Sequence, residues 1–357
     1  MTKTVNIGGV KIGGGNKIAV QSMANIKTEK ISEVCEQINA LKAAGCDIVR
    51  LAVKDDADAN AIAEIKKRVK VPIVADVHFD YKLAVKAIEN GVDKVRINPG
   101  NIGSVENVKK VADALKAHHI PVRVGSNGGS VEKEFLQKYG KNEISLAESA
   151  LKNVYALEKC GVTDIVISAK ASSVPLTVKT YRYLAKKTDY PLHIGVTEAG
   201  TYNSGIIKSA VGIGALLLDG IGDTVRVSLA ASPLKEPLAA IKILRAAGIY
   251  KNYAEVITCP TCGRTEYDSI GLAERVEELT AGIKTPLKIA VMGCVVNGIG
   301  EAADADVGIA GSKNYCVIFK KNEIIKKVPF NLAEEEFLKE IKKIANEVRH
   351  HTHKAYG

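Results

Sequence analysis

The sequence has no tryptophan, and aromatic residues make up only 5% of its 357 residues. No apolar run approaches the roughly 20 residues that a membrane-spanning helix needs, so we expect no membrane segment. The first residues, Met1 to Ile7, lack the apolar core of a signal peptide, and we therefore expect a cytoplasmic protein. In that reducing compartment the seven cysteines are expected to be free thiols or metal ligands, not disulfides.

Nucleic-acid binding is not indicated, although the formal net charge is +10. The basic residues do not form clusters interleaved with aromatic residues, which such binding usually needs. Lysine pairs such as Lys320-Lys321 have glutamate close by in the sequence and are typical of a solvated surface. We expect no nucleic-acid partner, and buried positive charge would better serve a small anionic substrate.

A short strand, a loop and an amphipathic helix recur eight times along the first 250 residues. Val, Ile, Ala and Gly are abundant throughout, as in parallel α/β folds. Eight such units predict an α/β fold of the (β/α)8 TIM-barrel type. The predicted strands are Lys17–Met23, Asp47–Val53, Pro72–His78, Lys94–Gly100, Pro121–Asn127, Asp164–Lys170, Leu192–Glu198 and Thr224–Ala230.

Two further segments complete the predicted organisation. Residues 5–16 indicate a hairpin that caps the bottom of the barrel, and residues 130–141 indicate an insertion at its mouth. After Tyr253 the composition changes, and strands alternate with helices in a small α+β unit. We therefore expect a barrel domain over residues 1–250 and a second domain over residues 251–357.

Charged side chains alternate with apolar ones along the predicted barrel strands. In Lys94-Val-Arg-Ile-Asn98 the apolar Val95 and Ile97 must face the helices, so Arg96 and Asn98 face the barrel centre. The same alternation turns a further set of polar residues inward, namely Arg50, Asp76, His78, Arg123, Asn127, Lys170, His193, Arg226 and Ser228, with Glu198 at a strand tip. Because barrel interiors are normally filled by branched apolar residues, this set predicts a binding site. Its excess of arginine suits phosphate groups.

Three cysteines in the second domain have the spacing of metal ligands. Cys259 and Cys262 lie in Thr258-Cys-Pro-Thr-Cys-Gly-Arg264, and Cys294 lies in a glycine-rich segment that ends at Glu301. A structural zinc site would normally close with a fourth Cys or His, and no histidine occurs in this domain before His350. Glu301 is the nearby candidate for a fourth ligand, and a carboxylate suits one iron of a [4Fe–4S] cluster better than a permanent zinc site. Structural zinc remains the alternative.

Several further motifs are specific when taken together. They are Val20-Gln-Ser-Met23 with Asn25, Val49-Arg50, Ala75-Asp-Val-His78, Val95-Arg-Ile-Asn-Pro-Gly-Asn101, Val122-Arg-Val-Gly125 with Asn127, Leu192-His-Ile-Gly-Val-Thr-Glu-Ala-Gly200, Gly220-Ile-Gly-Asp-Thr-Val-Arg-Val-Ser-Leu229, and the two cysteine segments. With these motifs the chain resembles a known family, the bacterial 4-hydroxy-3-methylbut-2-enyl diphosphate synthases of the non-mevalonate isoprenoid pathway. The resemblance extends over essentially the whole chain. Two departures are Ile299, where the family usually has Pro, and Ser312, where it usually has Gly.

The resemblance implies an enzyme that reduces 2-C-methyl-D-erythritol 2,4-cyclodiphosphate by two electrons. The ring opens, a hydroxyl group leaves as water, and an allylic diphosphate results. It also implies a [4Fe–4S] cluster held by Cys259, Cys262, Cys294 and Glu301, with electrons supplied by flavodoxin or ferredoxin. Such enzymes resemble head-to-tail homodimers in which the cluster domain of one subunit serves the barrel of the other.

The resemblance also distributes roles among the inward residues. Arg50, Arg96, Arg123, Lys170 and Arg226 would bind the diphosphate, helped by Asn98, Asn127 and Ser228. The candidates for orienting hydroxyl groups or supplying protons are Asp76, His78, His193 and Glu198, while Asn297 would contact the cluster or the substrate. Two alternatives stay open from the residues alone: a pterin-type barrel enzyme with a structural zinc domain, and an RNA-binding protein with a zinc-ribbon-like module.

Overall fold

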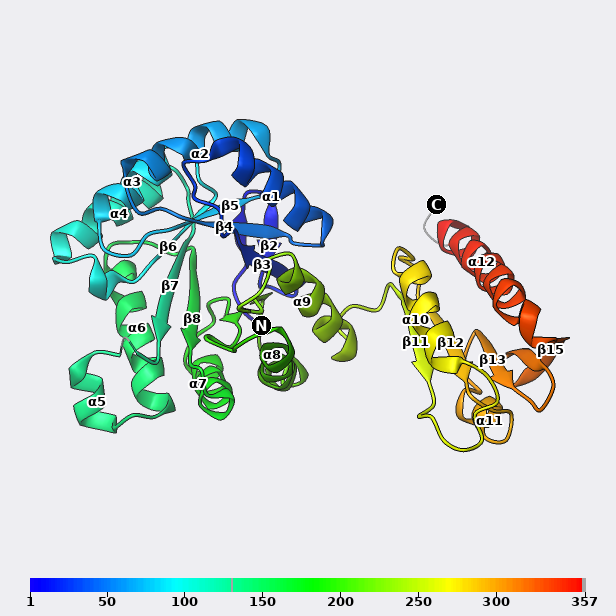
Figure 1. The fold of residues 1–357 in the computed structure, drawn as a ribbon. Helices are drawn as coiled ribbons and strands as arrows, with labels where there is room; N and C mark the ends of the chain where they lie inside the picture. The colour runs from blue at the N-terminus through cyan, green and yellow to red at the C-terminus, as the bar shows by residue number, and fades with distance from the viewer. Residues whose placement is uncertain (130, 355–357) are drawn as a thin grey trace. The chain divides into compact units, whose positions relative to one another are not determined.

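The computed structural model describes residues 1–129 and 131–354, which form two compact units. The first unit spans Met1–Ile249 and the second begins at Tyr250. No helix within the described residues is long and apolar enough to cross a membrane. Figure 1 shows the units as a ribbon, and each is described by itself below.

The first unit is built around an eight-stranded parallel sheet that closes into a barrel. Its strands are β3 (Ala19–Met23), β4 (Ile48–Ala52), β5 (Ile73–Asp76), β6 (Lys94–Ile97), β7 (Val122–Asn127), β8 (Ile165–Lys170), β9 (His193–Ile194) and β10 (Thr224–Val225). The order in the sheet is β8-β7-β6-β5-β4-β3-β10-β9, and a parallel bridge between Ile167 and Leu192 joins its two edges. The predicted TIM-barrel fold is therefore confirmed.

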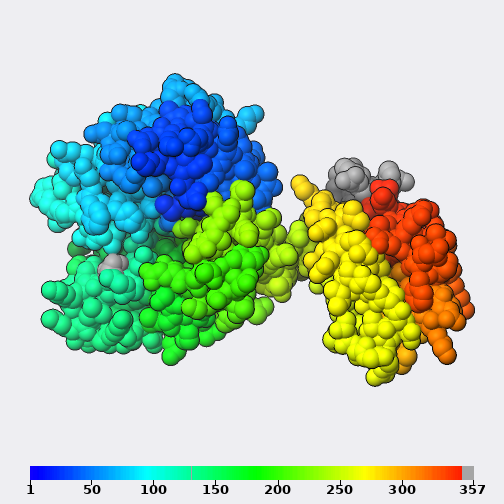
Figure 2. Space-filling model, viewed as in Figure 1, coloured from blue at the N-terminus to red at the C-terminus, as the bar shows by residue number. Residues whose placement is uncertain are grey.

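Helices cover the outside of the barrel, and Figure 1 shows them as a ring of coiled ribbons. They are α1 (Ile31–Ala43), α2 (Asp56–Arg68), α3 (Tyr81–Glu89), α4 (Val105–Ala117), α6 (Glu143–Lys159), α7 (Val174–Lys187), α8 (Tyr202–Leu218) and α9 (Lys235–Ala246). The last helix, α9, packs against β3, the first strand of the barrel. The yellow-green segment accordingly lies directly beside blue N-terminal segments in Figure 2.

Local sequence explains why these helices begin and end where they do. In α2, the Asp55 side chain accepts a hydrogen bond from the backbone N of Asp58, and the basic residues of the last turn complement the helix dipole. The buried residues Ala59, Ile62 and Ile65 recur at helical spacing and face the barrel. Gly45 and Gly91, which follow α1 and α3, have φ values of 93° and 83°, the left-handed conformation in which glycine commonly ends a helix.

Two short elements lie between barrel strands and helices. They are the 3-10 helix η1 (Pro99–Asn101), after β6, and α5 (Lys133–Tyr139), after β7. Helix α5 lies within the insertion predicted for residues 130–141, of which residue 130 is outside the described residues.

The last two barrel strands are shorter than the sequence predicts. The alternation predicts strands to Glu198 and Ala230, but β9 ends at Ile194 and β10 ends at Val225. Directly after β9, Gly195 has a positive φ of 157°. A Cβ atom placed on Gly195 would lie 2.3 Å from the carbonyl oxygen of Arg226, so the chain leaves the regular strand conformation at a position that only glycine can occupy without strain.

A hairpin closes the bottom of the barrel, as predicted. Its strands β1 (Val5–Ile7) and β2 (Val10–Ile12) pair antiparallel. Ile7 and Ile12 are buried in one apolar cluster with residues from the bottom of the barrel, namely Val5, Ala19, Ile48, Val74 and Val166. The hairpin therefore keeps water from the lower end of the barrel interior.

The second unit is a five-stranded mixed sheet with helices. Its elements are β11 (Ala254–Thr258), α10 (Ser269–Thr280), β12 (Leu287–Met292), α11 (Gly298–Glu301), β13 (Val307–Gly311), β14 (Cys316–Lys320), β15 (Glu323–Val328) and α12 (Phe330–Lys354). The first three strands are parallel, and β14 and β15 run antiparallel. Side chains of α10 and α12 pack with Ile289 and Ile309 in one cluster, whereas a second cluster around Met292 includes Ala302, the residue that follows α11.

The apolar contact between hairpin and barrel makes a testable contribution to stability. Replacing Ile12 by Ala removes buried methylene groups at the barrel bottom and is expected to lower the free energy of unfolding by about 2–5 kcal/mol. Lys11→Ala, on the same strand but exposed, is the matched control. Urea unfolding followed by circular dichroism measures both variants. Equal stability of the two would show that the hairpin does not close the barrel.

Candidate functional site

One cavity lies at the carboxyl ends of the barrel strands and has a volume of about 140 Å³. Every barrel strand from β4 to β10, or the segment directly after it, contributes to its wall. The lining residues are Arg50, Asp76, His78, Arg96, Arg123, Gly125, Asn127, Ser168, Lys170, Thr197, Arg226 and Ser228. Catalytic sites of TIM barrels occupy this end of the strands, so this cavity is the candidate site of the first unit.

Asp76 is the carboxylate at the centre of this charge cluster and is only 5% exposed. Its Oδ1 accepts a hydrogen bond of 3.1 Å from Nη1 of Arg96, and its Oδ2 lies 3.5 Å from Nε of Arg50. Burial alone would raise the pKa of the Asp76 carboxyl. Arg50, His78 and the other arginines outweigh burial and hold that pKa well below its usual range. Asp76 is therefore ionised at any physiological pH.

A second carboxylate, Glu236, was not recognised in the sequence. It lies in the first turn of α9, yet it is buried. Its Oε2 accepts hydrogen bonds from Nε of Arg226 at 3.3 Å and from Oγ of Ser22 at 2.8 Å. A glutamate in the first turn of a helix normally faces solvent and complements the helix dipole, so the local sequence gave no sign of this role.

Arg123 and Lys170 carry the positive charge of the cavity that these carboxylates leave unbalanced. Arg123 is 3% exposed, and its Nε and Nη1 have no hydrogen-bond partner within the described residues. Burial, with Arg50 and Arg96 nearby, lowers its pKa, and burial together with Arg123 and Arg226 lowers the pKa of Lys170. An anion in the cavity would relieve both effects, because it would neutralise buried charge and accept the free N–H groups.

The nearest cations are held in place by their neighbours. Arg50 donates from Nη2 to the sulfur of Met23 at 2.9 Å, and burial beside Arg226 lowers its pKa to about 9, so it stays charged at neutral pH. A Cβ atom on Gly125 would lie 3.0 Å from Nε of Arg96, so the glycine leaves room for that guanidinium group. The cavity is therefore shaped around its arginine side chains.

Three of the predicted barrel residues do not line the cavity. Asn98 is buried, and its Oδ1 accepts a hydrogen bond from the backbone N of Gly100, so that Asn98 caps the start of the short 3-10 helix η1. His193 is fully buried, with Nδ1 2.7 Å from Oγ1 of Thr224. Burial, with Lys170 and Arg123 nearby, lowers the pKa of His193, which is therefore neutral at pH 7. Glu198 is exposed just beyond Thr197 and has a left-handed φ of 52°.

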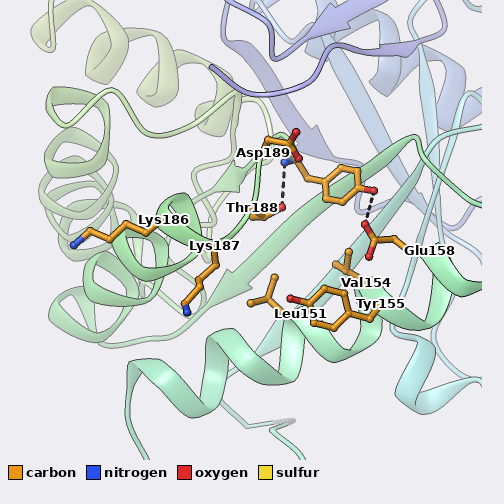
Figure 3. Close-up of a pocket in the computed structure, with 9 residues that line it drawn as sticks. Leu151, Val154, Tyr155, Glu158, Lys186, Lys187, Thr188 and Asp189 are labelled. Carbon is orange, nitrogen blue, oxygen red and sulfur yellow. Dashed lines mark hydrogen bonds between the residues drawn. The ribbon is translucent and has the colours of Figure 1, made fainter.

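A separate cavity of about 340 Å³ lies on the outside of the barrel, against α6 and the segment that follows α7 (Figure 3). Several of its polar groups already bond to one another. Tyr190 donates from its hydroxyl to Glu158 at 2.8 Å, and its backbone N donates to Thr188 at 3.2 Å. The segment Thr188–Tyr190 precedes β9, at the end of the barrel opposite to catalytic sites, so we do not assign the chemistry to this cavity.

In the second unit, two cysteine segments follow neighbouring parallel strands. Cys259 follows β11 and Cys294 lies two residues beyond β12, and the two strands pair with Thr258 opposite Val291. The backbone N of Gly293 donates a hydrogen bond of 3.2 Å to Sγ of Cys259. The fold thus brings the segment of Cys294 next to Cys259, as the strand order requires.

The other predicted ligands lie on exposed segments. Cys262 and Glu301 are both exposed, and so is Asn297, whose carbonyl oxygen accepts a hydrogen bond from the backbone N of Glu301. Within the described residues, no three His, Cys, Asp or Glu side chains are arranged to hold a metal ion. The four predicted ligands therefore do not form a closed site by themselves. The physical reason is that thiolate sites are rarely preformed without their metal, which pays for bringing the negative groups together.

The donor chemistry nevertheless fits an iron–sulfur cluster. Three thiols and a carboxylate are available on adjacent segments, and a backbone N–H already points to one sulfur, as is usual around such clusters. Ile299, the departure from the usual proline, packs with Cys259 against the apolar cluster around Met292. The remaining cysteines are elsewhere: Cys35, Cys46 and Cys316 are buried and Cys160 is partly exposed.

Comparisons with known proteins agree with both halves of this description. The family model described as the GcpE TIM-barrel domain matches residues 2–241, and the model described as the GcpE protein C-terminal domain matches residues 255–343. A protein of Caldanaerobacter subterraneus subsp. tengcongensis named 4-hydroxy-3-methylbut-2-en-1-yl diphosphate synthase (flavodoxin) is 57% identical, covering 97% of this chain and 98% of that protein. A protein of the same name from Fusobacterium nucleatum is 52% identical and covers 97% of each chain.

Solved structures show a similar barrel in proteins of low sequence identity. Dihydropteroate synthase from Stenotrophomonas maltophilia aligns with a TM-score of 0.51 at 14% identity, covering 69% of this chain and 97% of that one. The Yersinia pestis dihydropteroate synthase aligns with the same TM-score at 9% identity. At such identities the likeness concerns the fold alone, whereas the family models and the two sequence relatives extend over both units. The chain belongs to the GcpE family of 4-hydroxy-3-methylbut-2-en-1-yl diphosphate synthases.

Proposed function

We propose that this chain reduces 2-C-methyl-D-erythritol 2,4-cyclodiphosphate to 4-hydroxy-3-methylbut-2-enyl diphosphate. The observation that carries the proposal is the cavity at the strand ends, where Arg50, Arg96, Arg123, Arg226 and Lys170 converge. Asp76 and Glu236 neutralise part of this charge, and a substrate with two phosphate groups would neutralise the rest. Relatives that share half or more of their residues with this chain bear the name of this enzyme.

The residues that line the cavity have different proposed roles, according to where each one lies. The arginines and Lys170 would hold the diphosphate, and Asn127 and Ser228 lie at the same wall to accept or donate hydrogen bonds. Asp76 keeps Arg50 and Arg96 in place, so the phosphates meet guanidinium groups that are already oriented. His78 is half-exposed, lines the cavity and lies 2.9 Å from Nη1 of Arg96, so it is our first candidate to pass a proton to the leaving hydroxyl group.

Asn98, His193 and Glu198 do not line the cavity, and in this proposal they contribute from positions next to it. Asn98 shapes the turn after Arg96, and neutral His193 braces β10 through Thr224. Glu198, exposed in an uncommon backbone conformation next to the cavity residue Thr197, is placed to reach a substrate hydroxyl group.

Iron–sulfur chemistry comes with membership of this family, and we propose the [4Fe–4S] type. Cys259, Cys262 and Cys294 would hold three irons and Glu301 the fourth, with Asn297 beside it. When bound, such a cluster accepts and delivers electrons one at a time. We propose flavodoxin as the electron donor, with ferredoxin as the alternative, since the relatives carry flavodoxin in their names.

The cluster assignment predicts a selective effect of cysteine substitution. Protein purified without oxygen is expected to be brown, to contain about four irons per chain, and to turn over the cyclodiphosphate with reduced flavodoxin. Cys294→Ser is expected to lose iron and turnover, because serine is a poor ligand for this cluster. Cys160→Ser, on the barrel, is the matched control and should keep both. Stoichiometric zinc in colourless protein would instead support the structural zinc alternative.

The cavity assignment predicts that Arg123 contributes strongly to substrate binding. Its free N–H groups await an acceptor, so Arg123→Met is expected to raise the Kd for the cyclodiphosphate about 30- to 100-fold. Isothermal titration calorimetry of the cluster-loaded enzyme without reductant measures this. Arg68→Met, at an exposed position of α2, is the matched control. An unchanged Kd in Arg123→Met would place the substrate elsewhere.

We also propose that the chain acts as a homodimer in which the cluster of one subunit serves the barrel of the other. A mixed dimer of one Arg123→Met chain and one Cys294→Ser chain tests this. It contains one intact barrel and one intact cluster on different chains, so turnover at substrate concentrations near the wild-type Kd is expected only if the two cooperate across subunits. Separately tagged chains purified by tandem affinity supply the sample. A mixed dimer without turnover would mean that each cluster serves its own barrel.

A further inference from the structure

A layer of polar side chains lies inside the barrel, below the cavity that binds the diphosphate. Lys94 precedes the cavity residue Arg96 by two positions and Thr224 precedes Arg226 by two, so each pair faces the same side of its strand. Gln21 and His193 are buried in the same barrel interior, above the apolar hairpin cluster that contains Ala19. This layer is unusual, because branched apolar residues normally occupy this level of a TIM barrel.

The polar atoms of this layer are poorly satisfied. Within the part of the chain that the structure describes, Nζ of Lys94, Nε2 of His193 and both side-chain polar atoms of Gln21 have no hydrogen-bond partner. Arg123 adds two unpartnered nitrogens at the floor of the cavity. Buried polar atoms are rarely left without partners. Such a concentration of unpartnered atoms therefore indicates that these groups gain partners or change their charge when a ligand is bound.

Lys94 is the residue of this layer whose protonation state depends most on nearby charges. It is 0% exposed, and no carboxylate forms an ion pair with it within the described residues. The charged and titratable groups that act on it are Arg50 of β4, Arg123 of β7 and His193 of β9. The other titratable groups of the barrel interior line the cavity above it or face that cavity from α9, namely Asp76 of β5, Arg96 of β6, Lys170 of β8, Arg226 of β10 and Glu236 of α9. Asp76 and Glu236 are already engaged by arginines.

Electrostatics therefore disfavours a charged Lys94 in the free barrel. Burial, with Arg123 and Arg50 nearby, lowers the pKa of its amino group well below the usual value. An anion above Arg123 changes this balance, because its charge offsets the arginines that repel an ammonium group. Opening of the cyclic diphosphate strengthens the effect, since the terminal phosphate of the product has one more ionisable oxygen than it has in the ring.

We propose that Lys94 is a positioning residue for the diphosphate, neutral in the free barrel and protonated from solvent when the anion occupies the cavity. This inference rests on the proposed function. Lys94 does not exchange a proton with the substrate and breaks no bond. The positive charge that Lys94 gains lies beneath Arg123 and offsets the negative charge of the bound ligand. Ligand binding and proton uptake are therefore coupled.

The coupling is measurable as protons taken up on binding. The cyclodiphosphate is titrated into the cluster-loaded enzyme without reductant at about pH 8, well below the usual pKa of lysine, in two buffers with different ionisation enthalpies. Wild-type enzyme is expected to take up protons, and the uptake should fall towards low pH, where Lys94 is already charged. Lys94→Met should take up fewer protons than the wild type, by up to about one per site, and its Kd should depend less on pH. Some uptake remains in this variant because burial also lowers the pKa of Lys170 in the cavity wall. Lys109→Met, exposed on α4, should keep the wild-type uptake.

The possible results separate the inference from the proposed function. Wild-type enzyme that does not bind the cyclodiphosphate contradicts the proposed function. Wild-type enzyme that binds without proton uptake between about pH 6 and pH 9.5 overturns the role of Lys94, and so does undiminished uptake by Lys94→Met.

Folding of the variants is checked by thermal melting. Lys94→Met removes an unpartnered buried amine, so its free form is expected to melt no lower than the wild type. Should it fail to fold, Lys94→Arg tests the same point, because arginine is charged with or without ligand. Proton uptake in Lys94→Arg that equals the wild-type uptake would also overturn the proposal.

Discussion

Positive charge that is buried at the upper end of the barrel is the constraint on which the rest of the site depends. Arg96, Arg123 and Lys170 are all buried, and Arg50 and Arg226 are largely so. Such a group is costly to assemble, since each unpaired buried cation loses several kcal/mol of hydration. The barrel tolerates it because its outward-facing strand residues and its ring of helices supply the apolar core, which leaves the interior free for function.

Two carboxylates and one apolar contact stabilise this buried positive charge without neutralising all of it. Asp76 holds Arg50 and Arg96, and Glu236 holds Arg226 from the helix that closes the ring. The hairpin of β1 and β2 seals the bottom, so the polar layer around Lys94 is kept from bulk water. The uncompensated charge is concentrated at Arg123 and Lys170, beside the place where an anion would sit, and the unpartnered amine of Lys94 lies beneath them. The free barrel is thus organised for a ligand of opposite charge.

The second unit, which carries the predicted cluster ligands, has the opposite arrangement of charge. There the predicted ligands are negative when ionised, and all four are exposed or partly exposed. Only the neighbouring ends of β11 and β12, with the hydrogen bond from Gly293 to Cys259, are in place beforehand. In the barrel the protein supplies the charge and the ligand neutralises it, whereas here the metal would have to draw the thiolates together.

Much of this could be predicted from the sequence, because its strongest signals are local. Period-two alternation in segments such as Lys94-Val-Arg-Ile-Asn98 identifies a strand and the side that each residue faces, and eight such units imply a closed barrel. The spacing of Cys259, Cys262 and Cys294 likewise indicates a metal site without any coordinates. The prediction that the seventh barrel strand extends to Glu198 was wrong, because β9 ends directly before Gly195. The close contact of Gly195 with the carbonyl oxygen of Arg226 is not encoded in the residues on either side.

The sequence by itself determined the barrel, the second unit and the inward-facing arginines, since each follows from the order of neighbouring residues. Only the tertiary structure decided how those arginines are balanced. It buried Glu236 from a helix more than two hundred residues after Ser22, and it left His193 and Asn98 outside the cavity. It also left Lys94 without a partner at the barrel centre. The physical reason is that charge compensation depends on distances between residues remote in sequence, which no local pattern records.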